Sequence, residues 1–247
     1  MQNKRYLVII GDIVKSREII DREKIQSIFH EKITPGANLA LSEMINFDDN
    51  IVSSFTVTIG DEFQGVLKSA TRLFKFLYEF EYNIKHATTE NIDFRYGLGV
   101  GEITTKINKN AAIGMDGPAF YNARKSIEIA RANNLKNSFK SDSGNDDYIN
   151  ILLRWLSLEN KKWSFQKFQV IHLKKDGWTQ KQIAERLNIS QPAVSKVLKT
   201  TPVQLTEQTE QLIEDQINSL LKEKQAVTYS MVAEPNYKYN SKPRKNR

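Results

Sequence analysis

The segment FTVTIGDEFQGVL, residues 55–67, places two adjacent carboxylates between two short apolar runs of alternating strand character. The alternation predicts a β-hairpin whose turn holds Gly60, Asp61 and Glu62. Glycine supplies positive φ and aspartate tolerates turn geometry, so an ordinary hairpin turn explains the carboxylates when the segment is taken alone. A function for them needs a partner elsewhere in the chain.

The first apolar segment, YLVIIGDIVKSR at 6–17, supplies such a partner. It places Asp12 at the point where a buried strand emerges. If this strand neighbours the hairpin, Asp12 and Asp61 converge at one edge of the sheet. Two carboxylates and a backbone carbonyl such as that of Ile13 form the oxygen site that suits Mg²⁺ carrying a phosphorylated ligand.

Strand and helix patterns alternate between residues 5 and 140. Strands are predicted at 5–10, 51–59, 63–67 and 92–104, and helices at 21–32, 70–85 and 119–131. This order predicts an α+β domain with helices on one face of a largely antiparallel sheet. The polar residues 138–147 are expected to form an exposed connection. The glycines of GLGVGEI at 97–103 lie inside a strand pattern, which favours close backbone packing or the close approach of a ligand over a phosphate-binding loop.

Four motifs of this block resemble those of class III nucleotidyl cyclases and of diguanylate cyclases named for a GGDEF hairpin. They are IIGDIVKS at 9–16, VTIGDEFQGVL at 57–67, FRYGLGVGEITT at 94–105 and GPAFYNARKSIEIA at 117–130. Within this group the chain most resembles the SatD family of small bacterial proteins. The resemblance implies a ferredoxin-like, nucleotidyl-cyclase-type domain over residues 1–140.

The resemblance also implies roles for individual residues. Asp12 and Asp61 would be the paired metal-binding aspartates, Ile13 would lend its carbonyl, and Glu62 would match the glutamate of the GGDEF hairpin. The cofactor would be Mg²⁺ arriving with a nucleotide. The residues expected to contact the nucleotide are Lys15, Arg17, Glu62, Arg124 and Lys125.

The helix after the third motif departs from the cyclase pattern. Tyr121 and Lys125 stand where cyclases carry an asparagine and an arginine, while Asn122 and Arg124 lie one residue away. A shift of one residue rotates a helical side chain by ~100°, so these neighbours do not restore the pair. Nucleotide binding is therefore better supported than cyclisation, and no catalytic residue is assigned. An active cyclase or nucleotidyltransferase and a protein-interaction scaffold remain the alternatives.

Basic residues are concentrated in the C-terminal third of a chain whose formal net charge is +7. Residues 161–199 alone carry +7, and residues 236–247 add five bases without an acid. This distribution favours an anionic partner such as nucleic acid at the C-terminal part. Solvated surface lysines explain the charge equally well.

The segment WTQKQIAERLNISQPAVSKVLK, residues 178–199, predicts a helix-turn-helix, with a preceding helix at 165–174. Small Ala184 lets two helices cross closely, and Asn188 tolerates the left-handed turn where glycine is usual. The residues expected to contact DNA are Gln180, Ser190, Gln191, Ser195, Lys196 and Lys199. A generic helical hairpin and a protein-binding unit are the alternatives.

The complete prediction is a regulator in which a nucleotide held by the cyclase-like domain modulates a DNA-binding domain at 148–226. A basic tail at 227–247 is expected to be disordered. The amphipathic helix at 206–224 would pack on the helix-turn-helix or form the seam of a homodimer. No cysteine is present, and the three histidines are too scattered to predict a metal cluster. The sequence has no apolar run long enough to span a bilayer. We therefore expect a cytoplasmic protein that does not associate with a membrane.

Overall fold

The computed structural model describes residues 4–18, 21–33, 50–88, 92–144 and 146–222. The predicted basic tail at 227–247 lies outside these residues. Among the described helices, none has the length and apolar character needed to cross a membrane.

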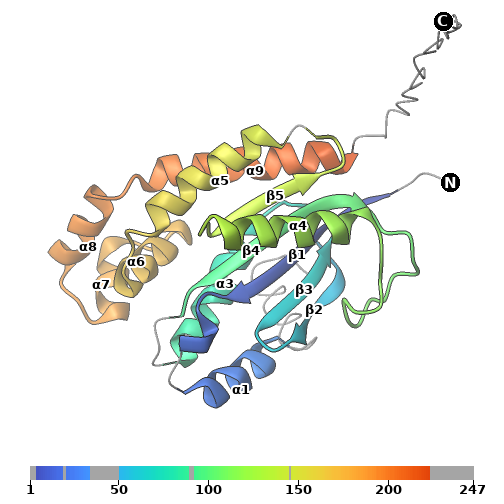
Figure 1. Cartoon of the computed structure of the whole chain (residues 1–247). Helices are drawn as coiled ribbons and strands as arrows, with labels where there is room; N and C mark the ends of the chain where they lie inside the picture. The colour runs from blue at the N-terminus through green and yellow to red at the C-terminus, as the bar shows by residue number, and fades with distance from the viewer. Residues whose placement is uncertain (1–3, 19–20, 34–49, 89–91, 145, 223–247) are drawn as a thin grey trace, which may run out of the picture.

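A five-stranded sheet forms the centre of the molecule, with strand order β2-β3-β1-β4-β5 (Figure 1). The strands are β1 Arg5–Ile13, β2 Ile51–Ile59, β3 Glu62–Leu67, β4 Phe94–Glu102 and β5 Asn137–Ser141. Central β1 is antiparallel to both β3 and β4, while β5 is parallel to β4. The predicted hairpin is confirmed as β2 and β3, with Gly60 at a φ of 63° in the turn.

Helices cover both faces of this sheet, so the prediction of helices on one face is wrong. One face packs against α1 Arg22–Lys32, α3 Leu73–Ala87, α5 Asp147–Asn160 and α9 Val203–Lys222 over the largest hydrophobic core, which is rich in phenylalanine. The opposite face packs against α4 Pro118–Ala132 over a smaller core.

Alternate glycines of β4 explain why α4 lies so close to the sheet. Gly97, Gly99 and Gly101 point to α4, while the intervening residues of β4 point to the larger core. A Cβ atom on Gly99 would overlap the backbone nitrogen of Ala123. The glycine-rich motif therefore serves close backbone packing, as the sequence predicted.

The edge strand β5 corrects another prediction, since residues 138–141 are not an exposed connection. Four of its five residues are buried. The Asn150 side chain bonds both the N–H and the C=O of Phe139, and Asp146 accepts from the N–H and hydroxyl of Ser141. Polar side chains of the next segment thus hydrogen-bond the backbone of this strand. The strand depends on them, and its own sequence lacks an apolar alternation. A domain boundary at residue 140 would cut through β5.

Three short helices follow: α6 Phe165–Lys175, α7 Gln180–Leu187 and α8 Gln191–Lys199. They enclose a separate small core of Val170, Leu173, Ile183, Ala184 and Val194. Asn188 ends α7 in the left-handed conformation with φ 52°, and the Ser190 hydroxyl accepts the N–H of Ala193 at the start of α8.

The last helix, α9, packs on the main core and not on the helix-turn-helix, while its role in a homodimer stays a prediction. Ile213 and Ile217 are fully buried in the main core, where α9 contacts α5, β1 and β4. The division into residues 1–140 and 148–226 stays a prediction, and the main core runs across it because α5, α6 and α9 all contribute to it.

Candidate functional site

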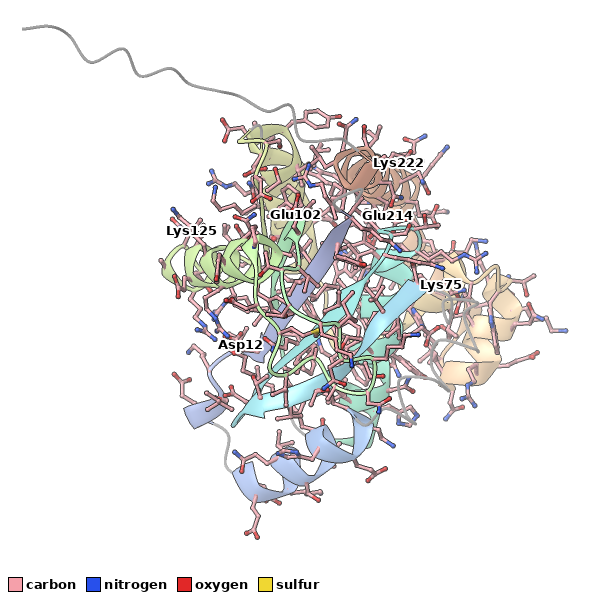
Figure 2. The ribbon with its side chains drawn as sticks, turned by 90° about the vertical axis from the view of Figure 1, so that its right-hand side faces the viewer. Asp12, Lys75, Glu102, Lys125, Glu214 and Lys222 are labelled. Carbon is pink, nitrogen blue, oxygen red and sulfur yellow. The ribbon has the colours of Figure 1, made fainter. Side chains whose placement is uncertain are left out.

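Asp12 and Glu62 lie side by side at one end of the sheet. The antiparallel register of β1 and β3 sets Gly11 opposite Phe63. Asp12 follows Gly11 and Glu62 precedes Phe63, so the two acids occupy the next facing positions of the two strands. Alternation along both strands points these carboxylates to the α4 side. Glu102 lies at the opposite end of β4, where it faces Arg5 in the strand register of β1 and β4 (Figure 2).

Two arginines of α4 hold both carboxylates. Arg131 Nε donates to Asp12 Oδ2 at 2.6 Å, and its Nη2 donates to Glu62 Oε2 at 2.9 Å. Arg124 binds both oxygens of Glu62, at 2.6 and 2.7 Å. The two arginines lie two helical turns apart, so they share one face of α4. Bidentate and bridging contacts of this kind are strong and geometrically specific.

Arg95 approaches Asp12 from the neighbouring strand. The β1–β4 register pairs these two residues, and Arg95 Nη1 lies 3.5 Å from Asp12 Oδ1. Only 12% of the Arg95 side chain and 7% of the Asp12 side chain are exposed. Arg95 Nε has no hydrogen-bond partner among the described residues. We call Asp12, Glu62, Arg95, Arg124 and Arg131 the arginine–carboxylate cluster.

The pKa values of the two carboxyl groups of the cluster are shifted in opposite directions. Burial raises the pKa of Asp12, and the Arg131 hydrogen bond and the charge of Arg95 only partly oppose this effect. Burial also acts to raise the pKa of Glu62, but hydrogen bonds from Arg124 and Arg131 outweigh it and lower that pKa. Glu62 is therefore the more firmly ionised of the two acids.

The sequence resemblance implies magnesium at Asp12 and Asp61, and the arrangement of the residues does not fit it. Both Asp12 oxygens face guanidinium groups, and Mg²⁺ requires oxygen ligands at about 2.0–2.1 Å in octahedral geometry. Two guanidinium groups beside the carboxylate also repel a dication. Asp61 is half-buried in the turn, near enough for its charge to raise the pKa of Asp12. Ile13 pairs with Phe94 and buries its side chain.

The other predicted nucleotide contacts lie apart from this cluster. Lys15 is exposed and pairs with Glu18 at 3.0 Å. Lys125 is exposed on the outer side of α4 (Figure 2). The Arg17 side chain lies outside the described part of the chain. Of the predicted residues, the structure therefore brings together Asp12, Glu62 and Arg124.

One substituted cyclase position, Tyr121, and the asparagine next to it have local roles. Asn122 is buried and donates to the carbonyl of Val100 and to Asp142. Tyr121 is exposed and donates to Asp116 at 2.8 Å.

Sequence reasoning missed Arg95 and Arg131. Seven residues separate Arg131 from Arg124, a spacing that places them on one helix face. Arg95 continues the alternation of Gly97, Gly99 and Gly101 on the α4 side of β4. Neither the helical spacing nor the strand alternation shows that these arginines meet Asp12 and Glu62 until the sheet register is known.

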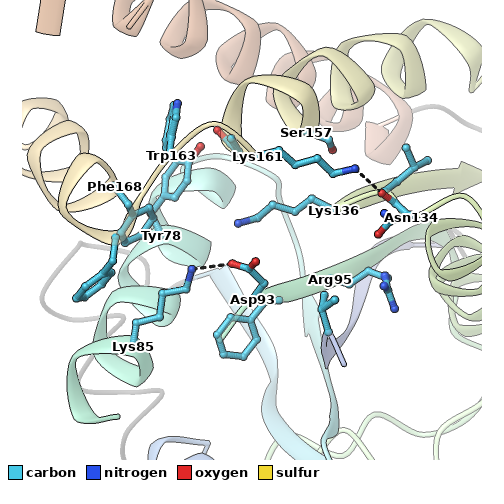
Figure 3. A pocket seen from close by; sticks show the side chains of 15 residues that line it. Tyr78, Lys85, Asp93, Arg95, Asn134, Lys136, Ser157, Lys161, Trp163 and Phe168 are labelled. Carbon is cyan, nitrogen blue, oxygen red and sulfur yellow. Dashed lines mark hydrogen bonds and ion pairs between the residues drawn. The ribbon is translucent and has the colours of Figure 1, made fainter. Parts of the chain in front are cut away.

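A cavity of about 220 Å³ lies next to the cluster and shares Arg95 with it (Figure 3). Its lining combines four cationic residues with five aromatic ones: Lys85, Arg95, Lys136 and Lys161, and Tyr78, Phe94, Trp163, Phe165 and Phe168. Asp93, which pairs with Lys85 at 3.1 Å, is the acidic residue in the lining. The cavity is therefore suited to a small anion that also carries a flat apolar group.

The cations of this cavity differ in how they are compensated. Lys136 pairs with buried Glu81 at 2.8 Å, and Lys85 lies 3.7 Å from the same carboxylate. Lys161 Nζ donates to the backbone carbonyl of Asn134 at 2.9 Å and has no acidic partner among the described residues. Lys161 is thus the cation of the lining best able to accept an external anion.

The predicted DNA-contacting residues gather around α8. Gln191, Lys196 and Lys199 are exposed, and Ser195 and Gln180 are half-exposed. The Ser190 hydroxyl caps α8 and is exposed beside them. Lys196 and Lys199 lie on the side of α8 away from buried Val194, and the polar side chains lie at the start of α8 and on α7.

Comparison with known proteins fixes the family of the chain. The model of the SatD family matches residues 6–225. The chain belongs to the SatD family. The crystal structure of the guanylyl cyclase Cya2 is similar to this SatD protein with a TM-score of 0.35 and 12% sequence identity, over 52% of this chain and 73% of that one. No curated protein matches the sequence.

Proposed function

We propose that this SatD protein is a DNA-binding regulator whose sheet domain binds a small nucleotide. In this proposal α7 and α8 form a helix-turn-helix, and α8 enters the major groove. The observation that carries the proposal is the exposed polar and cationic surface at the front of α8. The nucleotide would change the DNA affinity of that surface.

The geometry of α6, α7 and α8 supports a helix-turn-helix. The turn consists of residues 188–190, with a left-handed residue at its start and a capping hydroxyl at its end. A capping box of Thr179 and Gln182 fixes the start of α7. Buried Ile183, Ala184 and Val194 hold the two helices together. A rigid pair of helices with a well-capped second helix can present side chains to base edges.

The side chains on α8 match the chemistry of a DNA groove. Gln191 and Ser195 are one turn apart and lie on one helix face, where amide and hydroxyl groups can bond to base edges. Lys196 and Lys199 flank them and can bind phosphates. No described acid lies within ion-pair distance of either lysine, so their charges are available to a partner.

The cavity supports the ligand-binding half of the proposal. Its cations suit a phosphate and its aromatic side chains suit a base. Because both Asp12 oxygens already face arginines, we assign the nucleotide to this cavity, without a magnesium ion at Asp12. Phe165 and Phe168 of α6 line the cavity, and α6 packs against α7 and α8. A ligand there would contact the helix that supports the DNA-binding unit.

DNA binding is tested with the full chain and fluorescently labelled genomic fragments. Wild-type protein is expected to bind, and the double variant Lys196→Gln/Lys199→Gln is expected to bind at least about tenfold more weakly, since two phosphate contacts are lost. Lys125→Gln removes an exposed lysine from α4 and serves as the matched control. Equal binding by all three proteins would disprove the assignment to α8.

Nucleotide binding is tested by thermal melting with nucleoside monophosphates and triphosphates. A ligand at a hundred times its dissociation constant stabilises the folded state by ~2.7 kcal/mol. We expect a shift in wild type and in Lys162→Gln, and a smaller shift in Lys161→Gln. Lys162 is the adjacent lysine and lies outside the lining. Identical shifts in the two variants, or none with any nucleotide, would refute this site.

A further inference from the structure

Glu79, His172 and Asp176 form a cluster that the proposed function does not use. Glu79 belongs to α3, while His172 and Asp176 come from α6 and its C-terminal cap. His172 Nε2 lies 3.3 Å from Glu79 Oε1 and 3.9 Å from Asp176 Oδ2. One atom of each residue lies within 4.8 Å of the other two.

We propose that these three residues bind a divalent transition-metal ion, with Zn²⁺ as the best match. Zinc takes histidine nitrogen and carboxylate oxygen at about 2.0–2.2 Å in tetrahedral geometry, which separates neighbouring ligand atoms by roughly 3.4 Å. The separations of 3.3 and 3.9 Å from His172 Nε2 are close to that value, and the two carboxylates lie within 4.8 Å of each other, so side-chain rotations would bring all three onto one ion. A water or a further carboxylate would complete the coordination.

Burial gives an independent reason to expect a cation between these groups. The side chains of Glu79 and His172 are 8% and 6% exposed. Among the described residues, the close polar partner of the Glu79 carboxylate is His172 Nε2 alone. A carboxylate removed from water is costly unless it is paired and hydrogen-bonded, and a metal ion would supply that compensation.

The neighbouring side chains already hold the ligands in place. The His172 ring stacks between Phe168 and Tyr82, with centroids 6.0 and 5.2 Å away. Lys75 Nζ contacts Asp176 Oδ1 at 3.0 Å, so its charge opposes a cation at that oxygen, while Oδ2 faces the histidine. The ring contacts hold the His172 ligand in place, and the ion would have to bind at Oδ2 against the charge of Lys75.

A cavity gives the ion and its waters access to the cluster. It has a volume of about 220 Å³ and borders both His172 and Asp176. The bound ion would join α3, which packs on the sheet, to α6, which begins the three-helix unit. Histidine spacing alone could not predict this site, because carboxylates on two helices complete it.

The test is calorimetric titration of the chelator-dialysed full chain with ZnCl₂. We expect one high-affinity Zn²⁺ per chain in wild type, and at least about a hundredfold weaker binding in His172→Gln. His30→Gln makes the same substitution at an exposed histidine of α1 and is expected to bind like wild type. Asp176→Asn keeps the shape of a partly exposed side chain, so it tests the site even if His172→Gln fails to fold.

Thermal melting gives a second measurement of the same site. ZnCl₂ is expected to raise the midpoint of wild type and His30→Gln, and to leave that of His172→Gln and Asp176→Asn unchanged. Absence of Zn²⁺ binding by wild type would overturn the proposal. Equal binding by wild type, His172→Gln and Asp176→Asn would overturn it as well.

Discussion

The arginines of the sheet and the lysines of α8 carry the same charge in opposite surroundings. Arg124 and Arg131 donate hydrogen bonds to the carboxylate oxygens of Asp12 and Glu62 over 2.6–2.9 Å, and they join α4 to the ends of β1 and β3. Lys196 and Lys199 lie on an exposed helix face and are not in contact with any described acid. Charge in the first region is used within the fold, whereas charge in the second region is available to a partner.

The first prediction removes an arginine whose charge serves the fold. Arg131→Met leaves buried Asp12 with Arg95 alone, and loss of one partner of a buried ion pair typically costs about 3–5 kcal/mol. We expect the low end of that range for the free energy of unfolding, because 40% of the Arg131 side chain is exposed. Urea denaturation measures it.

Arg154→Met, which changes an exposed residue of α5, is the control, and a change within about 0.5 kcal/mol is expected for it. The double variant Asp12→Asn/Arg131→Met should recover part of the lost stability, because it removes the uncompensated charge. If Arg131→Met unfolds like Arg154→Met, the cluster does not stabilise the fold.

The second prediction concerns a buried carboxylate that lacks an arginine. Glu214 of α9 accepts the backbone N–H groups of Arg72 and Phe74 at the start of α3, at 2.8 and 3.1 Å. Burial raises the pKa of Glu214 to about 7 from an ordinary 4.5. Between these values the folded chain binds more protons than the unfolded chain, so stability falls as pH rises through this window.

Glu214→Gln should remove this loss of stability. The free energy of unfolding of the variant, relative to that of wild type, should therefore rise by roughly 2–3 kcal/mol between pH 4.5 and pH 8. Urea denaturation at several pH values measures the difference between the two proteins. Neighbouring Glu210 also has a raised pKa, because it too is buried, and it stays unchanged in both proteins. Parallel pH profiles of variant and wild type would show that Glu214 does not titrate in this range.

The third prediction concerns a lysine whose charge serves a partner. Lys196→Gln should weaken DNA binding by about 1 kcal/mol and reduce the salt slope of log K by roughly one, because one phosphate contact is lost. Its unfolding free energy should match that of wild type. Lys125→Gln should change neither quantity, and an equal reduction of the salt slope in both variants would indicate diffuse attraction.

Local patterns predicted much of this fold. The hairpin at residues 51–67, the helices of α3 and α4, and the close packing of the β4 glycines follow from alternation, helical spacing and glycine placement. Asp12 also emerged as a candidate because it follows a glycine at the end of a strand, and Glu62 because the hairpin resembles the GGDEF motif. These signals are local, so a single segment is enough to show them.

The errors concern features that depend on distant segments. Strand β5 is stabilised by Asp146 and Asn150, so its own sequence carries no strand pattern. The apolar stripe of α9 specified burial but not which surface it would contact. The ion pairs of Arg95 and Arg131 exist because β4 and α4 reach Asp12 across more than eighty residues of chain, which residue spacing cannot reveal.

The most direct test of the account compares the affinity of the full chain for two duplexes by fluorescence anisotropy. One duplex carries a sequence selected by the protein from a random pool, and the other carries the same bases in scrambled order. If α8 reads base edges, the full chain prefers the selected duplex by at least about a thousandfold at physiological salt, and Gln191→Ala reduces this preference tenfold or more. Equal affinity of the wild-type protein for both duplexes would contradict it.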